Sequence, residues 1–333
     1  MTRPAPARDL DLLILGDCNP DVMVLGDDLE PAFGQQEKLV DSMSLVTGGS
    51  ASIMAVAAAR LGLRVALIAA IGADAAGEFM LGQLAAEGVE TAAMVIRPGQ
   101  ATAMTVVLSR GSDRASLTAV GAMPTLTAAD VPAGLLSRAR HLHASSYFLL
   151  ERSLGPGLAG LFAAARAAGT STSLDTNWDP AGRWGDRQLA EVLRVTDVLL
   201  PNEAEALRIS ACGTLGDAVA ALAADGTRLV VKRGKSGALS AEADQWHAVS
   251  GPAELPGDYV DATGAGDCCD AGIVAGLLDG LDLPSCAALG CAVGAASTRA
   301  AGGTGIRTTL ADALALAKTA TVEQVPAASA ECY

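Results

Sequence analysis

Short apolar segments alternate with helical patterns along most of this chain, and that order restricts the folds it can adopt. Strand-like runs lie at 12–16, 64–71, 142–146, 171–175, 197–200 and 229–232. Helical patterns lie between them at 50–61, 75–87, 158–168, 187–192, 203–209 and 215–223. Strand–helix–strand units place successive strands parallel, with the helices covering the sheet. The order therefore predicts an α/β fold with a mostly parallel sheet.

Two stretches depart from this alternation. The runs 103–108 and 115–120 flank a polar turn and predict a hairpin. An apolar segment at 22–25 is followed at 27–46 by mixed charge, Pro and Gly, which indicates a loop with an edge strand. A hairpin between βα units predicts a small sheet that stands off the main body. The remaining helical segments are expected at 265–281, 284–301 and 310–318.

The composition restricts the partners and the compartment. A net charge of −14 disfavours nucleic acid and anionic lipid, although local amides and a metal ion can still hold phosphates. Seven Cys without a CxxC pair indicate thiols in a reducing compartment, and the three His lack zinc-site spacing with them. The first apolar run is too short for a signal sequence, and the uncharged stretch 285–298 is shorter than a membrane span. We therefore expect a cytoplasmic protein with small-molecule partners.

Three common motifs of nucleotide-binding and hydrolytic enzymes are absent from the sequence. Gly234-Lys235-Ser236 resembles the end of a P-loop, but the Gly that the motif needs at position 229 is Leu. No GxGxxG follows the first strand, and no GxSxG occurs. A P-loop, a Rossmann dinucleotide site and a serine-hydrolase elbow are therefore unsupported.

The segment 261–267, DATGAGD, precedes a helix of small residues and carries most of the chemical signal. Its small residues let a ligand approach the backbone, and the free N–H groups at a helix start favour an anion. Asp267, in the first turn, is placed to accept a proton from a hydroxyl beside amides that stabilise a transferring phosphoryl group. From the residues alone, a helix-stabilising carboxylate behind a simple glycine turn explains the segment equally well.

The same segment resembles the C-terminal signature of the ribokinase-like (PfkB-type) carbohydrate kinases. A second signature of that family lies at 48–62, where a Gly-Gly turn opens an Ala-rich helix. The resemblance implies a ribokinase-like three-layer α/β/α sandwich with a mostly parallel central sheet and a small β-sheet lid. In these terms, we expect a kinase domain at 1–320, with the lid formed from about 18–46 and 93–120, and a C-terminal tail at 321–333.

The resemblance also implies an ATP-dependent carbohydrate kinase and gives roles to individual residues. Asp267 is expected to be the catalytic base, beside an anion hole formed by Gly264, Ala265 and Gly266. Contacts with the substrate are expected from Asn19, Asp21, Gly48 and Gly49, in addition to Asp267.

The nucleotide and its metal ions are assigned in the same way. Contacts with ATP are expected from Asn202, Glu205, Lys232, Gly234 and Gly237. Glu205 would act on Mg²⁺ through water. Asp261 and Thr263 match the family's ligand positions for a monovalent cation, so activation by K⁺ is a hypothesis.

The acceptor side departs from the family pattern. Ile53 stands where many members have an Asn that contacts the sugar. The loop after 171–175 resembles fructokinase-like and ketodeoxygluconate-kinase-like members, but their Arg is not clearly matched, Arg183 being the nearest. Arg114 resembles an Arg of the family's lid. We therefore expect a small sugar-like acceptor without a clear preference for acidic sugars.

Two alternatives remain open from the sequence. One is a nucleoside kinase, for which Phe33 in the lid segment could stack on the base. The other is a non-catalytic sugar or nucleotide sensor on the same fold, which the retained Asp267 disfavours. A homodimer formed through the lid is a further hypothesis drawn from the family.

Overall fold

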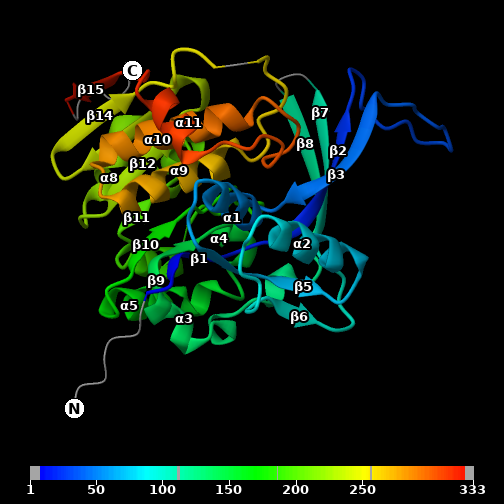
Figure 1. Ribbon diagram of the computed structural model, residues 1–333, viewed down its shortest axis with the longest axis horizontal. Coiled ribbons are helices and arrows are strands. Elements are labelled where there is room, and N and C mark those ends of the chain that lie inside the picture. Colours follow the sequence, from blue (N-terminus) through cyan, green and yellow to red (C-terminus); the bar gives the residue numbers. More distant parts are fainter. Residues whose placement is uncertain (1–7, 111–112, 186, 256, 327–333) are drawn as a thin grey trace.

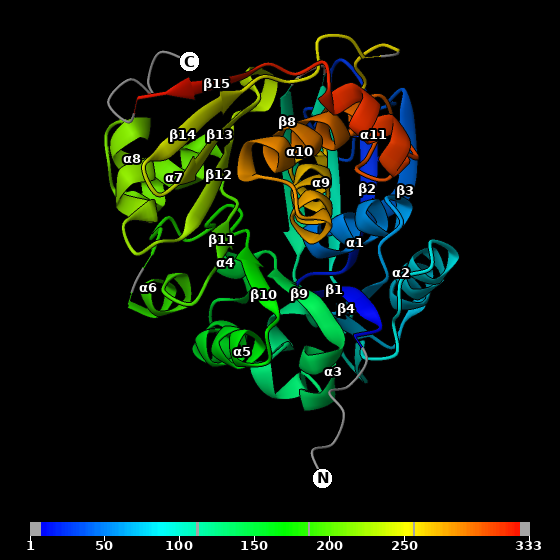
Figure 2. The ribbon, with the colours of Figure 1, turned by 60° about the vertical axis from the view of Figure 1, so that its left-hand side comes forward.

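The computed structural model describes residues 8–110, 113–185, 187–255 and 257–326. Its main body has three layers, with a large sheet between two sets of helices (Figures 1 and 2). In β1 (Leu10–Leu15), all six residues are buried. Leu12 and Ile14 pack into one apolar cluster and Leu13 and Leu15 into another, because successive side chains of a strand point to opposite faces. The continuous apolar run follows from this burial on both sides.

The main sheet of the described chain has nine strands, in the order β15-β14-β13-β12-β11-β10-β9-β1-β4. The strands from β12 to β4 run parallel, and the other three pair antiparallel, so the predicted mostly parallel sheet is confirmed. The parallel strands besides β1 are β4 (Val65–Ile68), β9 (Ala139–Ala144), β10 (Ser171–Leu174), β11 (Val198–Leu199) and β12 (Arg228–Lys232). The antiparallel strands are β13 (Ala238–Glu242), β14 (Gln245–Val249) and β15 (Val322–Val325).

Helices cover both faces of this sheet. One layer contains α3 (Ala133–Arg138), α4 (Tyr147–Leu150), α5 (Gly155–Ala167), α6 (Arg187–Leu193), α7 (Glu203–Ser210) and α8 (Leu215–Ala223). The other contains α1 (Ser50–Arg60), α2 (Ala75–Ala86), α9 (Ala265–Asp279), α10 (Leu283–Ser297) and α11 (Leu310–Ala317). Glycines let α9 and α10 approach closely, since a Cβ atom at Gly272 would lie 2.8 Å from Cα of Gly290. Single 3₁₀ turns lie at Met123–Thr125, Ala128–Asp130 and Gly234–Ser236.

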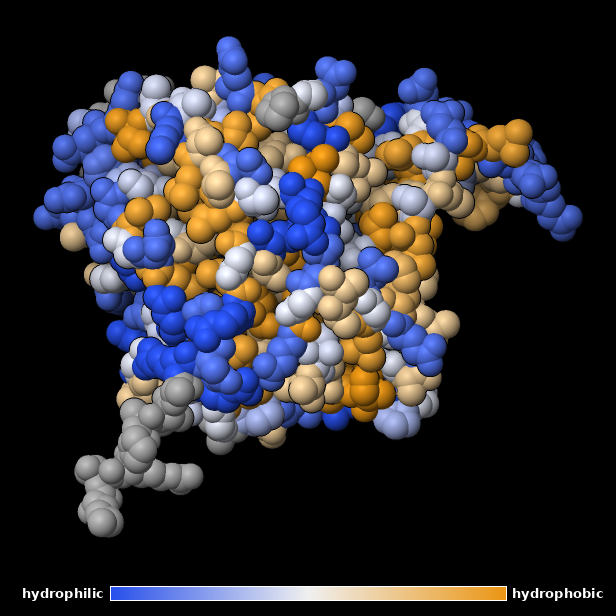
Figure 3. Space-filling view, in the orientation of Figure 1, coloured by the Kyte–Doolittle hydropathy of each residue, from blue (hydrophilic) through white to orange (hydrophobic). Residues whose placement is uncertain are grey.

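A second, four-stranded sheet projects from the body near α1 (Figure 1, upper right). Its strands are β3 (Ser42–Gly48), β2 (Asn19–Leu25), β7 (Met104–Arg110) and β8 (Asp113–Ala119), in that order. The antiparallel pairing of β7 with β8 confirms the predicted hairpin, whose turn residues 111 and 112 lie outside the described residues. Figure 3 shows hydrophobic and hydrophilic residues mixed on this projection. The expected separate small sheet is therefore present.

Two sequence-based expectations about strands need correction. The run 64–71 forms two strands, β4 and β5 (Ala70–Gly72), and β5 leaves the main sheet to pair with β6 (Val95–Arg97). The tail expected from residue 321 is wrong for Val322–Val325, which form β15 at the edge of the main sheet. Three of those four residues are exposed, so backbone pairing rather than an apolar run makes the strand.

Within the part of the chain that is described, no single helix has the length and apolarity to cross a membrane. One pair, α7 with α8, meets that criterion only when its two helices, bent by 66°, are taken together.

Candidate active site

A cavity of about 820 Å³ opens at the carboxyl ends of β10, β11 and β12, beside the start of α9. Asp175 follows β10, Asn202 follows β11 and Lys232 ends β12, and all three line the cavity. Ligands of open α/β sheets bind at this edge, and the volume suits a small-molecule site. The cavity is therefore the candidate active site.

The start of α9 forms one wall of the cavity. Gly264 caps the helix with φ +74°, and the residues from Gly264 to Asp267 all line the cavity. A Cβ atom at Gly264 would lie 2.5 Å from Cα of Gly303, so only glycine fits at this position. The N–H group of Ala265 donates to the carbonyl oxygen of Ala262 at 3.2 Å, and the other N–H groups at this helix start are suited to holding an anion such as a phosphoryl group.

Asp267 projects from this turn as a half-buried carboxyl group. Burial, followed by the negative charge of Asp175, raises the pKa of Asp267 to about 7. A carboxyl group with this pKa can accept a proton at neutral pH and still hold it strongly enough to act as a general base. Its position beside the helix amides suits proton removal from a group that attacks a bound phosphate.

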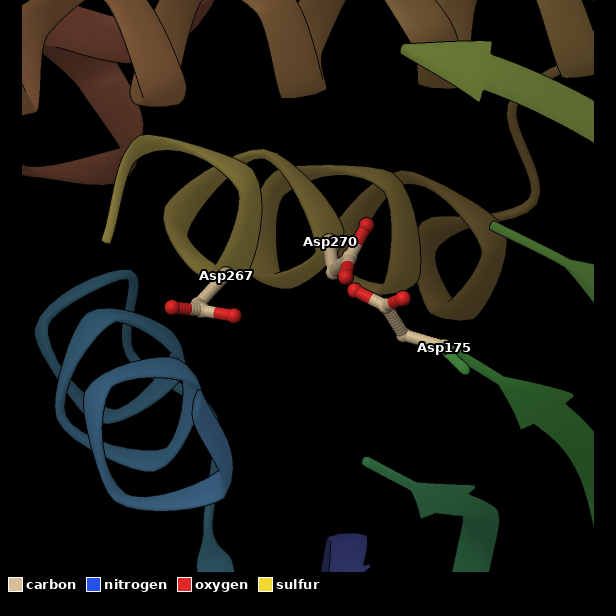
Figure 4. A group of neighbouring side chains, drawn as sticks. All are labelled: Asp175, Asp267 and Asp270. Atoms are coloured by element: carbon tan, nitrogen blue, oxygen red, sulfur yellow. The ribbon is translucent and has the colours of Figure 1, made fainter. Parts of the chain in front are cut away.

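Two further aspartates complete an acidic group with Asp267. Figure 4 shows Asp267 and Asp270 projecting from α9 and Asp175 from the end of β10, with the carboxyl groups of Asp175 and Asp270 facing one another. One carboxylate oxygen from each of the three lies within 4.8 Å of the others. Burial raises the pKa of Asp270 well above its usual value, and the positive charge of Lys232 opposes that rise. A cation among these three carboxyl groups would favour their ionised forms.

Lys232 supplies a cation at this point. Its Nζ donates to Oδ2 of Asp175 at 2.8 Å and to both carboxylate oxygens of Asp270 at 3.0 Å. Burial opposes its charge, but Asp175 and Asp270 outweigh that effect and raise the pKa of Lys232. The ammonium group is therefore fixed in its charged form between the two aspartates.

The motif at the start of α7 faces the same cavity. Asn202 caps the helix, its Oδ1 accepting from the backbone N–H of Glu205 at 2.9 Å. Oε2 of Glu205 accepts in return from the backbone N–H of Asn202 at 2.8 Å, which completes a capping box. Burial, followed by the charge of Asp175, raises the pKa of Glu205 to about 7. A carboxylate held in this environment would gain from a divalent cation nearby.

Gly234 and Gly237 form the turn after β12 and also line the cavity. Their φ angles are +56° and +81°, and a Cβ atom at Gly237 would overlap the carbonyl oxygen of Val249. Glycine is therefore required at Gly237 for the backbone to follow this path.

Apart from Asp267, the residues expected to bind substrate cluster between β2 and the start of α1, and they do not line this cavity. Asn19 and Asp21 are buried, and Nδ2 of Asn19 donates to Oδ1 of Asp21 at 2.8 Å. A Cβ atom at Gly48 would overlap the carboxyl group of Asp21. Burial, followed by the charge of Asp17, raises the pKa of Asp21 to about 7. Ser50, the first residue of α1, joins this cluster to the cavity wall.

Asp261 and Thr263 hold the loop before α9 and likewise lie outside the cavity wall. Oδ1 of Asp261 accepts from the Thr263 hydroxyl at 3.0 Å, and its Oδ2 accepts from the backbone N–H of Gly302 at 3.0 Å. Nη1 of Arg114, from β8 of the small sheet, donates to Oγ1 of Thr263 at 3.4 Å. Arg114 also lines the cavity, so the small sheet reaches the site through this side chain.

The structure thus brings together the expected catalytic and nucleotide-binding residues around one cavity. The sequence did not indicate Asp270, because an Asp inside a small-residue helix gives no local signal of its ion pair with Lys232. Trp178 was missed as well. It is 54% exposed, lines the cavity, and has the guanidinium carbon of Arg208 5.2 Å from its ring centroid. In the sequence, nothing distinguishes a Trp that lines a cavity from a Trp elsewhere on the surface, because the difference depends on where the loop after β10 lies.

Two departures from the family now have structural explanations. Ile53 is buried and packs against Gly264 and Gly303, beneath the start of α9. Arg183 pairs with Glu151 and does not line the cavity. No arginine from the loop after β10 therefore faces the cavity in the described residues.

The fold and this site define an α/β enzyme of the phosphoryl-transfer class. The chain belongs to the pfkB family of carbohydrate kinases, whose family model matches residues 9–309.

Known proteins support the same placement. A nucleoside kinase from Methanothermobacter thermautotrophicus is 29% identical over 290 residues, covering 86% of this chain and 89% of the relative. An ATP-dependent ribose-1-phosphate kinase from Halopiger xanaduensis is 30% identical over 271 residues, covering 79% and 83%. A structure from E. coli, provisionally described as ribokinase II and solved with ATP and Mg²⁺, has a TM-score of 0.80 at 24% identity, covering 93% and 99%. This structural likeness confirms the ribokinase-like fold.

Proposed function

We propose that Asp267 is the catalytic base of an ATP-dependent kinase that phosphorylates a hydroxyl group of a small sugar-like molecule. The family supports the reaction class. The observation that carries the assignment is the Asp267 carboxyl group, with a pKa of about 7, in the same helical turn as the amides at the start of α9. This turn places a proton acceptor beside an anion-binding site in one cavity.

In the proposed reaction, the acceptor hydroxyl attacks the γ-phosphorus of ATP while the bond to the β–γ bridging oxygen breaks. The hydroxyl proton passes to Asp267, and ADP leaves. The amides around Gly264–Gly266 hold the charge that develops on the transferring group. Positioning and electrostatics carry most of the rate increase in reactions of this kind.

The nucleotide would lie over the ends of β11 and β12, where Asn202, Gly234 and Gly237 line the cavity. Mg²⁺ would offset charge on the phosphate oxygens when bound. Asp175 and Asp267 bring carboxyl oxygens close together at the cavity, which suits a divalent cation, and Glu205 would hold it through water.

On the acceptor side, Asn19, Asp21, Gly48 and Gly49 would bind the hydroxyl groups of the substrate. Asp21 and its hydrogen bond from Asn19 lie behind the Gly-Gly turn, and Ser50 connects this turn to the cavity. We also propose that the small sheet of β2, β3, β7 and β8 acts as a lid and that it is the surface for a homodimer. Its exposed side chains Met43, Leu45 and Leu117 support the second idea.

A monovalent cation, K⁺ in particular, would bind near Asp261 and Thr263, which hold the loop before α9. The test is the initial rate in matched Na⁺ and K⁺ buffers. A higher rate in K⁺ supports the site, and equal rates contradict it.

A nucleoside acceptor is the second candidate. Trp178 offers an exposed ring in the cavity, braced edge-on by Trp184 with ring centroids 4.6 Å apart. Phe33, suggested from the sequence, is 94% exposed and does not line this cavity. If a base stacks on Trp178, then Trp178→Ala should lose activity with nucleosides and keep activity with sugars. Equal effects on the two kinds of acceptor would contradict this stacking.

The test of the proposal is ADP release from ATP–Mg²⁺ across pentoses, hexoses, sugar phosphates, keto-deoxy acids and nucleosides, with Asp267→Asn as the control. We expect turnover with one group of acceptors and its loss in the variant. Turnover that survives Asp267→Asn would contradict the assigned base. No turnover with any acceptor, in a protein that still binds ATP, would favour a non-catalytic sugar or nucleotide sensor. The cytoplasmic location remains a prediction from the sequence.

A further inference from the structure

The ion pairs of Lys232 join three elements that are far apart in sequence. Lys232 ends β12, Asp175 follows β10, and Asp270 lies in the second turn of α9 (Figure 4 shows the two aspartates). The three side chains are 11%, 4% and 1% exposed, respectively. Because burying charges costs several kcal/mol per ion, about what their attraction returns, such a group is weak support for stability alone.

The ammonium group also lies at the anion-binding turn. Nζ of Lys232 is 3.6 Å from the position that a Cβ atom on Gly266 would take. Lys232 and Gly266 both line the cavity. The fixed cation therefore stands next to the amides proposed to hold the transferring phosphoryl group.

The donor inventory of Nζ leaves room for a ligand. An ammonium group has three N–H donors. Asp175 and Asp270 are the only residues of the described chain that accept hydrogen bonds from it. The two Asp270 oxygens belong to one carboxylate and are equally distant from Nζ, so a single N–H is shared between them while a second N–H meets Asp175. The two carboxylates thereby set the direction of the third N–H.

We propose that Asp270 is a positioning residue that, together with Asp175, aims the third N–H of Lys232 at a terminal phosphoryl oxygen of the nucleotide. This inference rests on the proposed kinase function and assigns a role to a residue that the mechanism above does not use. The side chain of Asp270 is buried and does not line the cavity, so it acts through its neighbours, of which Lys232 is the cation. Asp175 is a less selective position for substitution, because its Oδ1 also accepts from the backbone N–H of Asn177 at 3.0 Å.

The test compares Asp270→Asn with Asp279→Asn, the same change at an exposed position near the end of the same helix. We expect Asp270→Asn to lower kcat by roughly 10- to 100-fold with little change in the KM of the acceptor, because misplacement by about 1 Å can cost that much. Asp279→Asn should match the wild type. Retention of kcat within about twofold in folded Asp270→Asn would overturn the proposal.

A double-mutant cycle separates positioning from general structural support. In a Lys232→Met background, Asp270→Asn should have no further effect on kcat, since the group that it positions is gone. Equal losses in both backgrounds would contradict the proposal. If Asp270→Asn alone fails to fold, the kcat of Lys232→Met is compared with that of the double variant. Equal values support the proposal, and a further loss in the double variant contradicts it.

Measurements of nucleotide binding test the role of Asp270 separately from the proposed kinase function. By titration, Asp270→Asn should weaken ATP binding and leave AMP binding unchanged, because only ATP carries the terminal phosphoryl group. Equal weakening of both nucleotides, or of neither, would count against the role of Asp270 even in a protein that turns over. If the wild type transfers phosphate to no acceptor, while Asp270→Asn still weakens the binding of ATP but not of AMP, the kinase function is refuted and the role of Asp270 stands.

Discussion

Two aspartates one turn apart on α9 have different environments and therefore different chemistry. Asp270 is almost fully buried and paired with Lys232, so its carboxyl group is committed to that contact. Asp267 faces the cavity, and burial with the nearby charge of Asp175 raises its pKa to about 7. The residue that remains available to a ligand is the one suited to accept a proton near neutral pH.

The pH dependence of the reaction follows from this environment. Only the deprotonated Asp267 can take the acceptor's proton, so we expect kcat/KM to rise with pH through about 7 and level off above it. The measurement is kcat/KM for the acceptor between about pH 5 and about pH 9. The pKa values of Asp21 and Glu205 are also raised to about 7, so Asp21→Asn is the control on the acceptor side and Glu205→Gln the control on the nucleotide side. Loss of the acidic limb in either variant would assign the titration to the residue substituted and contradict the role of Asp267.

At the scale of elements, the start of α9 depends on a glycine that no other residue can replace. Gly264 combines a φ of +74° with close contacts to Gly303 and Ile53. Gly280, at the other end of the helix, has a φ of +80° but nothing within 4 Å of a Cβ atom. The two positions share a left-handed backbone conformation, which glycine adopts without strain, and differ in how crowded the space around a Cβ atom would be.

Alanine substitutions at these two glycines should therefore differ in outcome. Gly280→Ala should cost about 1–2 kcal/mol of unfolding free energy, the strain of a left-handed residue, and keep kcat. Gly264→Ala should cost more and lower kcat by roughly 100-fold, because the amides of the turn shift. Denaturant unfolding and steady-state kinetics measure both quantities. Equal kcat in the two variants would refute the importance of the turn.

The start of α2 offers a test of stability away from the site. Oδ1 of Asp74 accepts from the backbone N–H of Gly77 at 2.9 Å, and Oδ2 accepts from that of Thr102 at 2.8 Å. Asp74→Ala should lower the unfolding free energy by at least about 1–2 kcal/mol, since it removes a cap and leaves a second N–H group unpaired. Thermal unfolding checks the loss, with kcat of the folded fraction expected to be unchanged. An unchanged midpoint would contradict this account of the cap.

The alternation of buried strands and helices was predictable because strands such as β1 carry a continuous apolar run, at 12–15 in that strand. β15 was not, since Val322–Val325 are mostly exposed and hold their place by backbone pairing. In the site, the glycine turn and Asp267 could be found because their chemistry is local. The pairing of Asp270 with Lys232 could not, because it depends on how α9 crosses the end of β12.

At the scale of the whole molecule, the small sheet and the body meet at the site. Arg114 from β8 contacts Thr263, in the loop before α9, and lines the cavity. The contact places one side chain of the projecting sheet beside the proposed anion hole. If this sheet closes over the acceptor, Arg114 should contribute to binding more than to the chemical step.

We therefore expect Arg114→Ala to raise the KM of the acceptor by roughly tenfold with a smaller change in kcat, as for lost ground-state binding. Arg110→Ala, at the end of the neighbouring strand β7, is the control and should leave both constants unchanged. Steady-state kinetics with varied acceptor makes the comparison. Equal effects of the two substitutions would indicate a general charge effect of the sheet.

The central claim is that this cavity transfers the γ-phosphoryl group of ATP to an acceptor hydroxyl with Asp267 as the base. The most direct measurement follows labelled γ-phosphate from ATP into the acceptor, in the wild type and in Asp267→Asn, with nucleotide binding measured in parallel. The account predicts labelled acceptor from the wild type, and from the variant at least about 100-fold less at unchanged ATP affinity. Label found only in inorganic phosphate, or equal transfer by the variant, would contradict it.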